Sequence, residues 1–393
     1  MKRLLIFLVL LPHIAFAQTR YHKDFNECWT TIRDNYAYLG QQQIDWNKVK
    51  VIYQPRADTV SSTNSFIRLL EDLLNELYNG HSSLNTNLQS SNRLVPSGLD
   101  LFAERRGSRY IITDLRRGFG AEQCGLRTGM EVVRFNGKGI DSQLYRFLPR
   151  YTKDHTPAMV QYAISMLFAG THDQPRTITV LENGMEKDYF PDRLAVPAPQ
   201  GLLEYKLIRP GTGYIRINNS LGDNGLIAAF DAALDSLMNT RSLVIDLTET
   251  PGGGNTTVAR AIMGRFITAR HPYQQHEYDE TGFDTRRNWL EYVLPRRTAY
   301  KGKVYILAGR WTGSMGEGMA IGFDGMKQVT VIGTPMAGLL GAISGFRLTE
   351  TGIGFQVPTE RLYHADGTPR EQFVPRIRTA NGEETFREMR KIK

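Results

Sequence analysis

The chain has 393 residues, with 48 Lys and Arg against 40 Asp and Glu, and it carries 18 Phe, 18 Tyr and 4 Trp. This length predicts two or three domains, because single hydrophobic cores stop growing at about 250–300 residues. The many aromatic residues exclude intrinsic disorder. Two cysteines in the whole chain exclude a disulfide scaffold.

Residues 1–17 have the pattern of a secretory signal peptide. Two basic residues precede an apolar run from Leu4 to Leu11, and Ala15-Phe16-Ala17 forms a small-x-small cleavage motif. The apolar run is shorter than the ~20 residues that a membrane-spanning helix needs. We therefore expect an exported protein, periplasmic or extracellular, with no stable membrane anchor after signal removal.

The remaining basic residues are scattered in pairs, and the formal charge falls from +8 to +6 without the signal. A nucleic-acid partner would need a continuous basic stripe, so none is expected. Cys28 and Cys124 fall in different predicted domains and are expected as free thiols, although export leaves a pairing open.

Residues 18–90 predict an N-terminal helical domain. Apolar residues between Phe66 and Leu77 recur at helical spacing, after a Ser/Thr/Asn cluster that can cap the helix. Gly80 is a good residue for a helix end, so we expect the helix to stop there. His81 would then lie at the helix exit.

Residues 91–192 predict a small β domain. Strands are expected at 110–112, 131–135 and 177–180, the last followed by a hairpin turn at Asn183-Gly184. Between the first two strands, the segment from Gly120 to Met130 and the following Asn136-Gly137 turn resemble a PDZ domain. A helical insertion at about 141–172 interrupts this domain.

Residues 193–393 predict an α/β domain, because strands at 213–218, 242–247, 303–308 and 328–332 alternate with helices. This order implies crossover connections and a buried, mainly parallel sheet. Active sites of such sheets lie on the loops at the carboxyl ends of the strands.

Two of these loops contain residues that could bind an anion or act as a nucleophile. The loop at 248–255 carries three glycines before a helix, so its N–H groups can bind negative charge, but it lacks the residues of a phosphate-binding loop. Alternatively, this glycine loop is only a tight turn that packs against the sheet. In the second loop Ser314 stands at a strand-to-helix junction, as a nucleophile or as a simple helix cap.

Five segments in order resemble the C-terminal processing peptidase and tricorn-core family of serine peptidases: LLNELYNGHSSL, LVIDLTETPGG, TGSMGE, VIGTPMAG and DGTPREQFVP. The resemblance implies a multidomain α+β fold. Its parts would be an N-terminal helical domain, a PDZ-like β domain and a C-terminal α/β crotonase-like peptidase domain.

The same resemblance implies the site residues. Ser314 would be the nucleophile, and the backbone N–H groups of Gly252, with Gly253 adjacent, and Met315 would form the oxyanion hole. One branch of the family uses a Lys as base, but Leu339 holds that position here. The tricorn-like branch uses a His and a Glu, which correspond to His81 as general base and Glu371 as its orienter.

Several residues depart from the family pattern near this site. Gly80 replaces a Ser, Thr248 and Glu249 replace an Arg and a Gly, and Arg376 replaces an Asp. In the PDZ-like segment Asp100 replaces a Gly of the expected carboxylate-binding loop at 97–101. Its charge would repel a peptide carboxylate, so we expect weak or absent recognition of peptide C-termini.

Three functions compete at this point. The first is an exported serine endopeptidase that cleaves polypeptides. The second is a catalytically impaired peptide-binding protein of the same fold. The third is a crotonase-like acyl-CoA enzyme, which export disfavours because coenzyme A thioesters are intracellular. No cofactor is expected, and no metal site, because His271 and His276 lack ligand spacing. The oligomeric state and the physiological substrate stay open.

Overall fold

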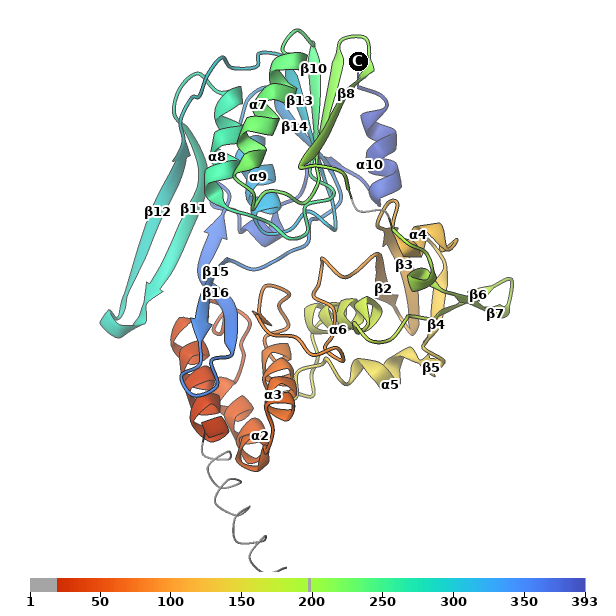
Figure 1. Cartoon of the computed structure of the whole chain (residues 1–393), viewed down its shortest axis with the longest axis vertical. Coiled ribbons are helices and arrows are strands. Elements are labelled where there is room, and N and C mark those ends of the chain that lie inside the picture. The colour runs from red at the N-terminus through yellow and green to blue at the C-terminus, as the bar shows by residue number, and fades with distance from the viewer. Residues whose placement is uncertain (1–19, 197–198, 393) are drawn as a thin grey trace, which may run out of the picture.

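The computed structural model describes residues 20–196 and 199–392, so the expected signal peptide at 1–17 lies outside the described residues. The described chain is a mixed α/β molecule in which N-terminal helices, a small β domain and a larger α/β domain meet at the centre (Figure 1). None of the helices in these ranges combines the length and apolarity that a bilayer span requires.

The N-terminal helices comprise the helical residues 20–35, α2 (Trp46–Thr59) and α3 (Thr63–Asn75). The side chain of Ser62 caps α3 by accepting the N–H of Ser65 at 3.2 Å. The helix stops five residues before the predicted end at Gly80. Glu76 ends it, because its buried carboxylate accepts hydrogen bonds from the Tyr53 hydroxyl at 2.7 Å and the Arg150 N–H at 2.8 Å.

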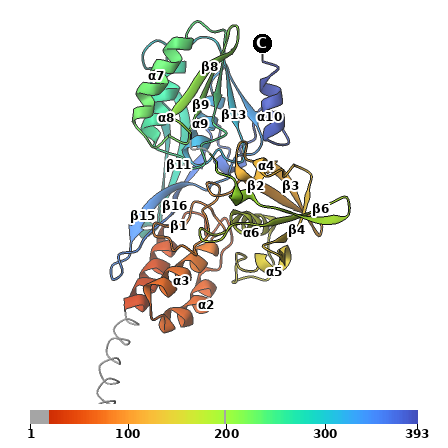
Figure 2. The same ribbon diagram turned by 45° about the vertical axis from the view of Figure 1, so that its right-hand side comes forward.

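Strands from the C-terminal half pack on these helices. One sheet has the order β1-β16-β11-β12, with β15 paired to β16. Its strands are β1 (Ser83–Leu84), β11 (His271–Glu280), β12 (Thr285–Val293), β15 (Ala342–Arg347) and β16 (Gly354–Tyr363). Leu348, Phe355 and Val357 share a buried core with the N-terminal helices, and β15 and β16 lie beside those helices in Figures 1 and 2. The N-terminal core is therefore completed by residues more than 250 positions away.

The small β domain is a sheet of order β2-β3-β4-β6-β7, with β5 paired to β4. Its elements are β2 (Leu101–Arg106), β3 (Arg109–Leu115), α4 (Gly120–Gln123), β4 (Glu131–Phe135), β5 (Lys138–Gly139), α5 (Ile140–Leu144), α6 (Pro157–Ala169), β6 (Ile178–Glu182) and β7 (Met185–Tyr189). The predicted strands are confirmed, and both residues of the Asn183-Gly184 turn have positive φ. The free edge of β2 faces α6, where the Gln161 side chain donates to the Ala103 carbonyl at 3.0 Å.

The larger domain contains a sheet of order β17-β14-β13-β10-β9-β8, parallel except for the β8–β9 pair. Its strands are β8 (Leu203–Arg209), β9 (Thr212–Ile217), β10 (Ser242–Asp246), β13 (Lys303–Ala308), β14 (Val329–Gly333) and β17 (Ile377–Arg378). Every residue of β10 is buried, as expected for a strand covered on both faces. The predicted parallel strands are confirmed.

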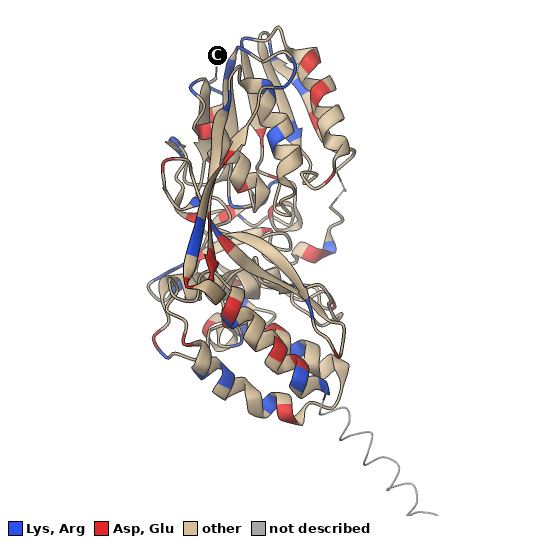
Figure 3. Ribbon diagram, turned by 90° about the vertical axis from the view of Figure 1, so that its left-hand side faces the viewer, with Lys and Arg blue, Asp and Glu red and all other residues tan. Residues whose placement is uncertain are grey.

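Helices cover both faces of this sheet, as Figure 2 shows. One face packs against α7 (Gly225–Leu237), α8 (Thr256–Met263) and α9 (Met315–Asp324), and the other against α10 (Gly382–Met389). The remaining elements are short 3₁₀ helices: η1 (Pro191–Arg193), η2 (Gly264–Phe266), η3 (Thr281–Phe283) and η4 (Arg370–Gln372). Acidic and basic residues are interspersed on the helices facing the viewer in Figure 3.

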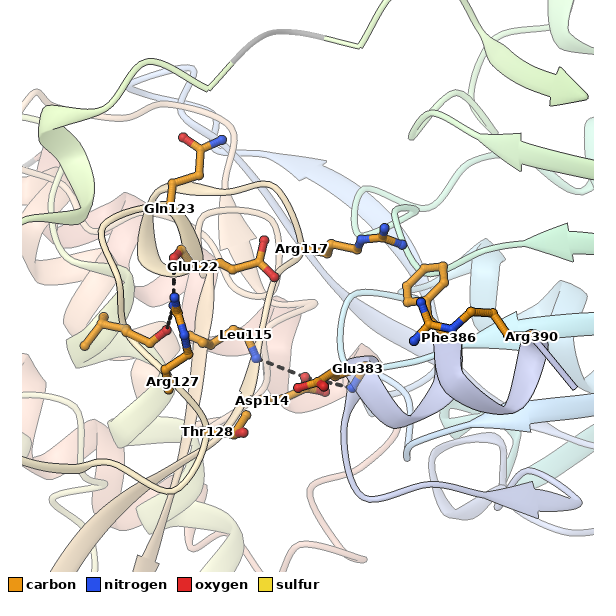
Figure 4. A pocket seen from close by; sticks show the side chains of 12 residues that line it. Asp114, Leu115, Arg117, Glu122, Gln123, Arg127, Thr128, Glu383, Phe386 and Arg390 are labelled. Atoms are coloured by element: carbon orange, nitrogen blue, oxygen red, sulfur yellow. Dashed lines mark hydrogen bonds between the residues drawn. The ribbon is translucent and has the colours of Figure 1, made fainter. Parts of the chain in front are cut away.

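The small β domain also touches α10. A cavity of about 450 Å³ lies between them (Figure 4), and in its lining the Asp114 carboxylate accepts the N–H of Gly382 at 2.9 Å. Beside it the Arg117 guanidinium stacks on the Phe386 ring, 4.4 Å from its centroid. These contacts link the β domain to the C-terminal end of the chain.

Candidate active site

The two loops singled out in the sequence meet at the carboxyl ends of β10 and β13. Thr250 and Thr312 form a parallel bridge between them, and the N–H of Gly313 donates to the Thr250 carbonyl at 3.2 Å. The Thr312 hydroxyl adds a bond of 2.8 Å to the Leu247 carbonyl. These bonds hold the loop at 248–255 and the loop that carries Ser314 together at this edge of the sheet.

Ser314 occupies a strained turn between β13 and α9. Its φ of 52° and ψ of −113° lie in a region that residues other than glycine seldom adopt. Such a turn presents a side chain at the top of a sheet, as nucleophile elbows do. Ser314 is the N-cap residue of α9, and its hydroxyl lies 2.9 Å from His81 Nε2. The structure thus confirms Ser314 as the N-cap residue of α9 and also places its hydroxyl against His81.

Gly253 packs directly against this serine. A Cβ atom at Gly253 would lie 2.4 Å from Ser314 Cβ and 2.8 Å from its Oγ, and Gly253 itself has a φ of 66°. Both the space and the backbone conformation require glycine here. Gly253 therefore allows this loop to approach Ser314 closely.

His81 reaches the site from the segment between α3 and β1. Its Nδ1 lies 2.9 Å from the Leu340 carbonyl oxygen. Because a carbonyl only accepts, Nδ1 carries the proton and the neutral ring leaves Nε2 free to accept from the Ser314 hydroxyl. Burial, together with the charge of Arg370, lowers the pKa of His81 to about 4, so the ring is neutral at pH 7.

Glu371 does not make the contact expected of it. The position that would orient His81 is taken by the Leu340 carbonyl, and Glu371 Oε2 is buried with no hydrogen-bond partner among the described residues. Burial raises the pKa of Glu371. The expectation that this carboxylate orients the imidazole is not met in this geometry.

A buried Glu317–Arg370 pair organises the loops around Ser314, and sequence reasoning missed both members. Glu317 accepts the N–H groups of Ser314 at 2.7 Å and Gly338 at 2.9 Å. Arg370 lies 3.9 Å from Glu317 and donates to the carbonyls of Leu339 at 2.7 Å and Gly341 at 3.0 Å. Burial raises the pKa of Glu317 to about 7. Glu317 stands three residues after Ser314, the spacing of a capping box, and that signal could have identified it.

The predicted oxyanion donors are only partly free. The N–H of Gly252 donates to the Asn219 side-chain oxygen at 2.7 Å, and the N–H of Gly253 makes a longer bond of 3.3 Å to the Thr250 carbonyl. Met315 begins α9, where N–H groups have no intrahelical acceptor, and a Cβ at Gly253 would lie 3.1 Å from its nitrogen. The Met315 N–H is therefore the donor best placed beside Ser314.

The small β domain contacts both loops of the site. The Trp311 indole N–H donates to the Leu99 carbonyl at 2.6 Å. Arg116 Nε lies 3.0 Å from Glu249 Oε2 in a pair whose side chains are 7% and 10% exposed. Glu249, which departs from the family pattern, is thus the partner of an arginine from the β domain.

Within residues 20–196 and 199–392, no group of three or more His, Cys, Asp or Glu has the arrangement of a metal site. His276, for example, lies between the carboxylates of Glu291 and Glu360 and stacks on Trp289. This histidine has a structural environment, and the chemistry available at Ser314 is nucleophilic.

Comparisons with known proteins agree with this chemistry. Residues 211–377 match the model of Peptidase family S41, and residues 17–75 match the Tricorn protease C1 domain. Similar solved structures are mature CPAF complexed with lactacystin (15% identity, 96% of this chain and 97% of that chain, TM-score 0.64), the photosystem II D1 C-terminal processing protease (16%, 91% and 93%, 0.57) and a lipoprotein from Streptococcus agalactiae (12%, 95% and 95%, 0.51). No curated protein matches the sequence.

At these identities the structural likeness shows a shared fold. The fold, the family models and the serine–imidazole contact together define the class: a serine-type peptidase. Residues 211–377 are similar to peptidase family S41, and residues 17–75 to the Tricorn protease C1 domain.

Proposed function

We propose that the protein is an exported endopeptidase that cleaves polypeptides, with Ser314 as nucleophile and His81 as general base. The observation that carries the proposal is the 2.9 Å contact between Ser314 Oγ and His81 Nε2, in the tautomer that accepts the hydroxyl proton. Ser314 Oγ attacks the peptide carbonyl carbon while its proton moves to Nε2. The imidazolium then protonates the leaving amine, and water hydrolyses the acyl-enzyme by the same steps.

The oxyanion that forms on the carbonyl oxygen would be held by the Met315 N–H and by Gly252 or Gly253 of the glycine loop. Two fixed N–H donors in a water-poor site stabilise this charge, and the loss of one such donor costs about 3 kcal/mol elsewhere. For Gly252 this role requires release of its N–H from Asn219. A carbonyl rather than a carboxylate orients His81, so the imidazolium is stabilised by a dipole alone.

Turnover of a peptide by a Ser314→Ala protein tests the proposal. The variant should fold as the parent does, because Ala removes only the hydroxyl, and should lose at least ~10³-fold in kcat. Retained activity would contradict the assignment. A parent protein that binds the peptide without turning it over would instead favour the second candidate, a peptide-binding protein of the same fold.

We also propose the finer domain assignments: a helical domain at 18–90, a PDZ-like domain at 91–192 and a crotonase-like peptidase domain at 193–393. Two contacts support weak recognition of peptide C-termini by the PDZ-like part: the Gly98 and Leu99 N–H groups already donate to the Leu94 and Pro96 carbonyls, at 2.6 and 3.1 Å. The Asp100 carboxylate pairs with Arg176 at 2.6 Å, so its charge is compensated and the expected repulsion does not contribute. Equal KM for a peptide with a free and an amidated C-terminus is expected, and a strong preference for the free acid would refute this.

A further inference from the structure

The last strand of the large sheet, β8, has an edge that no described strand pairs with. β8 ends the order β17-β14-β13-β10-β9-β8 and, among the described strands, bonds only to β9 (Figure 1). All residues from Glu204 to Leu207 are exposed, so the edge and both faces beside it are open to solvent. At the other end of the sheet, β17 has only two residues and offers little edge. An open edge as long as that of β8 is a template for another strand.

The pairing with β9 determines which backbone groups of β8 point outward. Just beyond the two strands, the N–H of Asn218 donates to the Leu202 carbonyl at 3.0 Å, and the register continues regularly as far as Leu207. Hydrogen-bonded positions alternate along an antiparallel pair, so the even-numbered residues of β8 bond to β9. The N–H and C=O groups of Leu203, Tyr205 and Leu207 therefore face the open edge.

The side chains of β8 fall into an apolar and a charged set. Leu203, Tyr205 and Leu207 share one face of the strand, and Tyr205 and Leu207 are 51% and 60% exposed. Glu204 and Lys206 share the other face and are both exposed. The nearest printed charge to the Glu204 carboxylate is an arginine of β9 at 3.9 Å, a weak surface contact. Both sets are available to a partner strand.

We propose that β8 pairs with β8 of a second copy of the chain, antiparallel about a two-fold axis at Tyr205, so that the two large sheets become one. In this register apolar side chains meet on one face and opposite charges meet on the other: Tyr205 lies opposite the partner's Tyr205, Leu203 opposite the partner's Leu207, and Glu204 opposite the partner's Lys206. The outward N–H and C=O groups then occupy hydrogen-bonded positions. The ion pairs fall on the closer, non-hydrogen-bonded positions, where cross-strand side chains interact best.

Charge and backbone geometry exclude the neighbouring registers. An axis at Lys206 would place this lysine opposite the partner's Lys206, and an axis at Glu204 would place two glutamates opposite each other. An axis between two residues would set outward backbone groups of one strand against inward groups of the other, so no regular ladder would form. The pattern is thus complementary to itself about one axis, as a two-fold interface requires, and this favours a second copy over a foreign strand.

Sedimentation velocity of the intact protein, over a roughly hundredfold range of concentration, tests the pairing. A monomer should convert to a dimer as the concentration rises. Lys206→Glu and Glu204→Lys should each raise the dissociation constant at least tenfold, because like charges then lie opposite each other. The double variant Glu204→Lys/Lys206→Glu exchanges the charges and should return the constant to within about twofold of the parent value. The matched control is Lys138→Glu, an exposed residue of the small β domain that should change nothing.

Cysteine crosslinking tests the register. In Tyr205→Cys the two new thiols lie opposite each other, with about 5.5 Å between Cα atoms, a distance that a disulfide can span. This variant should form a covalent dimer on mild oxidation. Glu204→Cys should not, because its thiols lie opposite the partner's Lys206 rather than opposite each other. The parent protein, which keeps Cys28 and Cys124, gives the background.

Four outcomes would overturn the proposal. The first is a protein that stays monomeric at every concentration. The second is a dimer that neither charge reversal weakens, because another surface would then hold it. The third is crosslinking of Glu204→Cys but not of Tyr205→Cys. The fourth is dissociation of the dimer by a peptide substrate added to Ser314→Ala, because the edge would then hold substrate. Equal thermal unfolding midpoints in dilute solution show that the charge variants are folded.

Discussion

At the scale of single residues, the contact between the two proposed reacting residues could be predicted from the sequence, whereas the groups that support them could not. Ser314 and His81 stand in motifs whose neighbours are small residues and a helix exit, and the structure brings them to 2.9 Å. The carbonyl of Leu340 that orients His81 leaves no signature in the sequence, because every residue has a carbonyl. Arg370 likewise acts through backbone carbonyls, so only the folded chain reveals it.

The buried environment of His81 leads to a prediction about its protonation. Its pKa is lowered from an ordinary value of about 6.5 to about 4, so the ring stays neutral and able to accept a proton well below neutral pH. NMR titration of the His81 ring should show a midpoint near pH 4. Because the unfolded state binds this proton more readily, the free energy of unfolding should also fall as pH drops from 6.5 toward 4. A ring midpoint near 6.5 would show that the site is open to water.

Asn219 gives a second prediction at this scale. Its side-chain oxygen accepts the N–H of Gly252. Asn219 itself has a φ of 54°, a backbone conformation that glycine adopts without strain. Asn219→Gly should therefore free the donor while keeping the turn. We expect the rate of Ser314 acylation by a fluorophosphonate to rise several-fold, because the oxyanion no longer competes with a side chain. A lower rate would mean that Asn219 holds the glycine loop in its working position.

At the scale of elements, regular patterns were predictable and pairing between distant segments was not. The parallel strands read as short buried runs between helices, and the structure confirms them at β9, β10, β13 and β14. The hairpin β11–β12 was missed, because its first strand, HPYQQHEYDE, is polar and lacks a clear alternation of apolar residues. The helix end was misplaced at Gly80, because the side-chain bonds that stop α3 at Asn75 come from Tyr53 and Arg150.

The contact between Arg116 and Glu249 joins two elements and predicts a stability effect. Glu249→Gln leaves a buried guanidinium without its charge partner, so the free energy of unfolding should fall by about 3–5 kcal/mol. The double variant Arg116→Met/Glu249→Leu should recover more than half of this loss. The control is Glu186→Gln, which breaks the exposed Arg134–Glu186 pair and should cost about 1 kcal/mol or less. A similar small loss for Glu249→Gln would show that water reaches the interdomain pair.

At the scale of the whole molecule, three parts of the chain contribute to one site. His81 comes from the N-terminal segment, Ser314 from the α/β domain, and Leu99 of the small β domain accepts the Trp311 indole N–H beside them. Five sequence segments stand in the same order as in the family they resemble, and this order indicated that distant parts of the chain form one site. It did not indicate that the N-terminal helices share their core with residues 348–357, because such long-range packing has no local pattern.

The most direct test of the central claim is covalent labelling of the intact protein by a fluorophosphonate, followed by peptide mapping of the modified residue. The account predicts one label, on Ser314, formed at neutral pH in the parent protein. Labelling should be lost in Ser314→Ala and slowed by at least ~10²-fold in His81→Ala, because the general base is removed. A label on another residue, or undiminished labelling of Ser314 in His81→Ala, would contradict the assignment of this serine and histidine as the reacting pair.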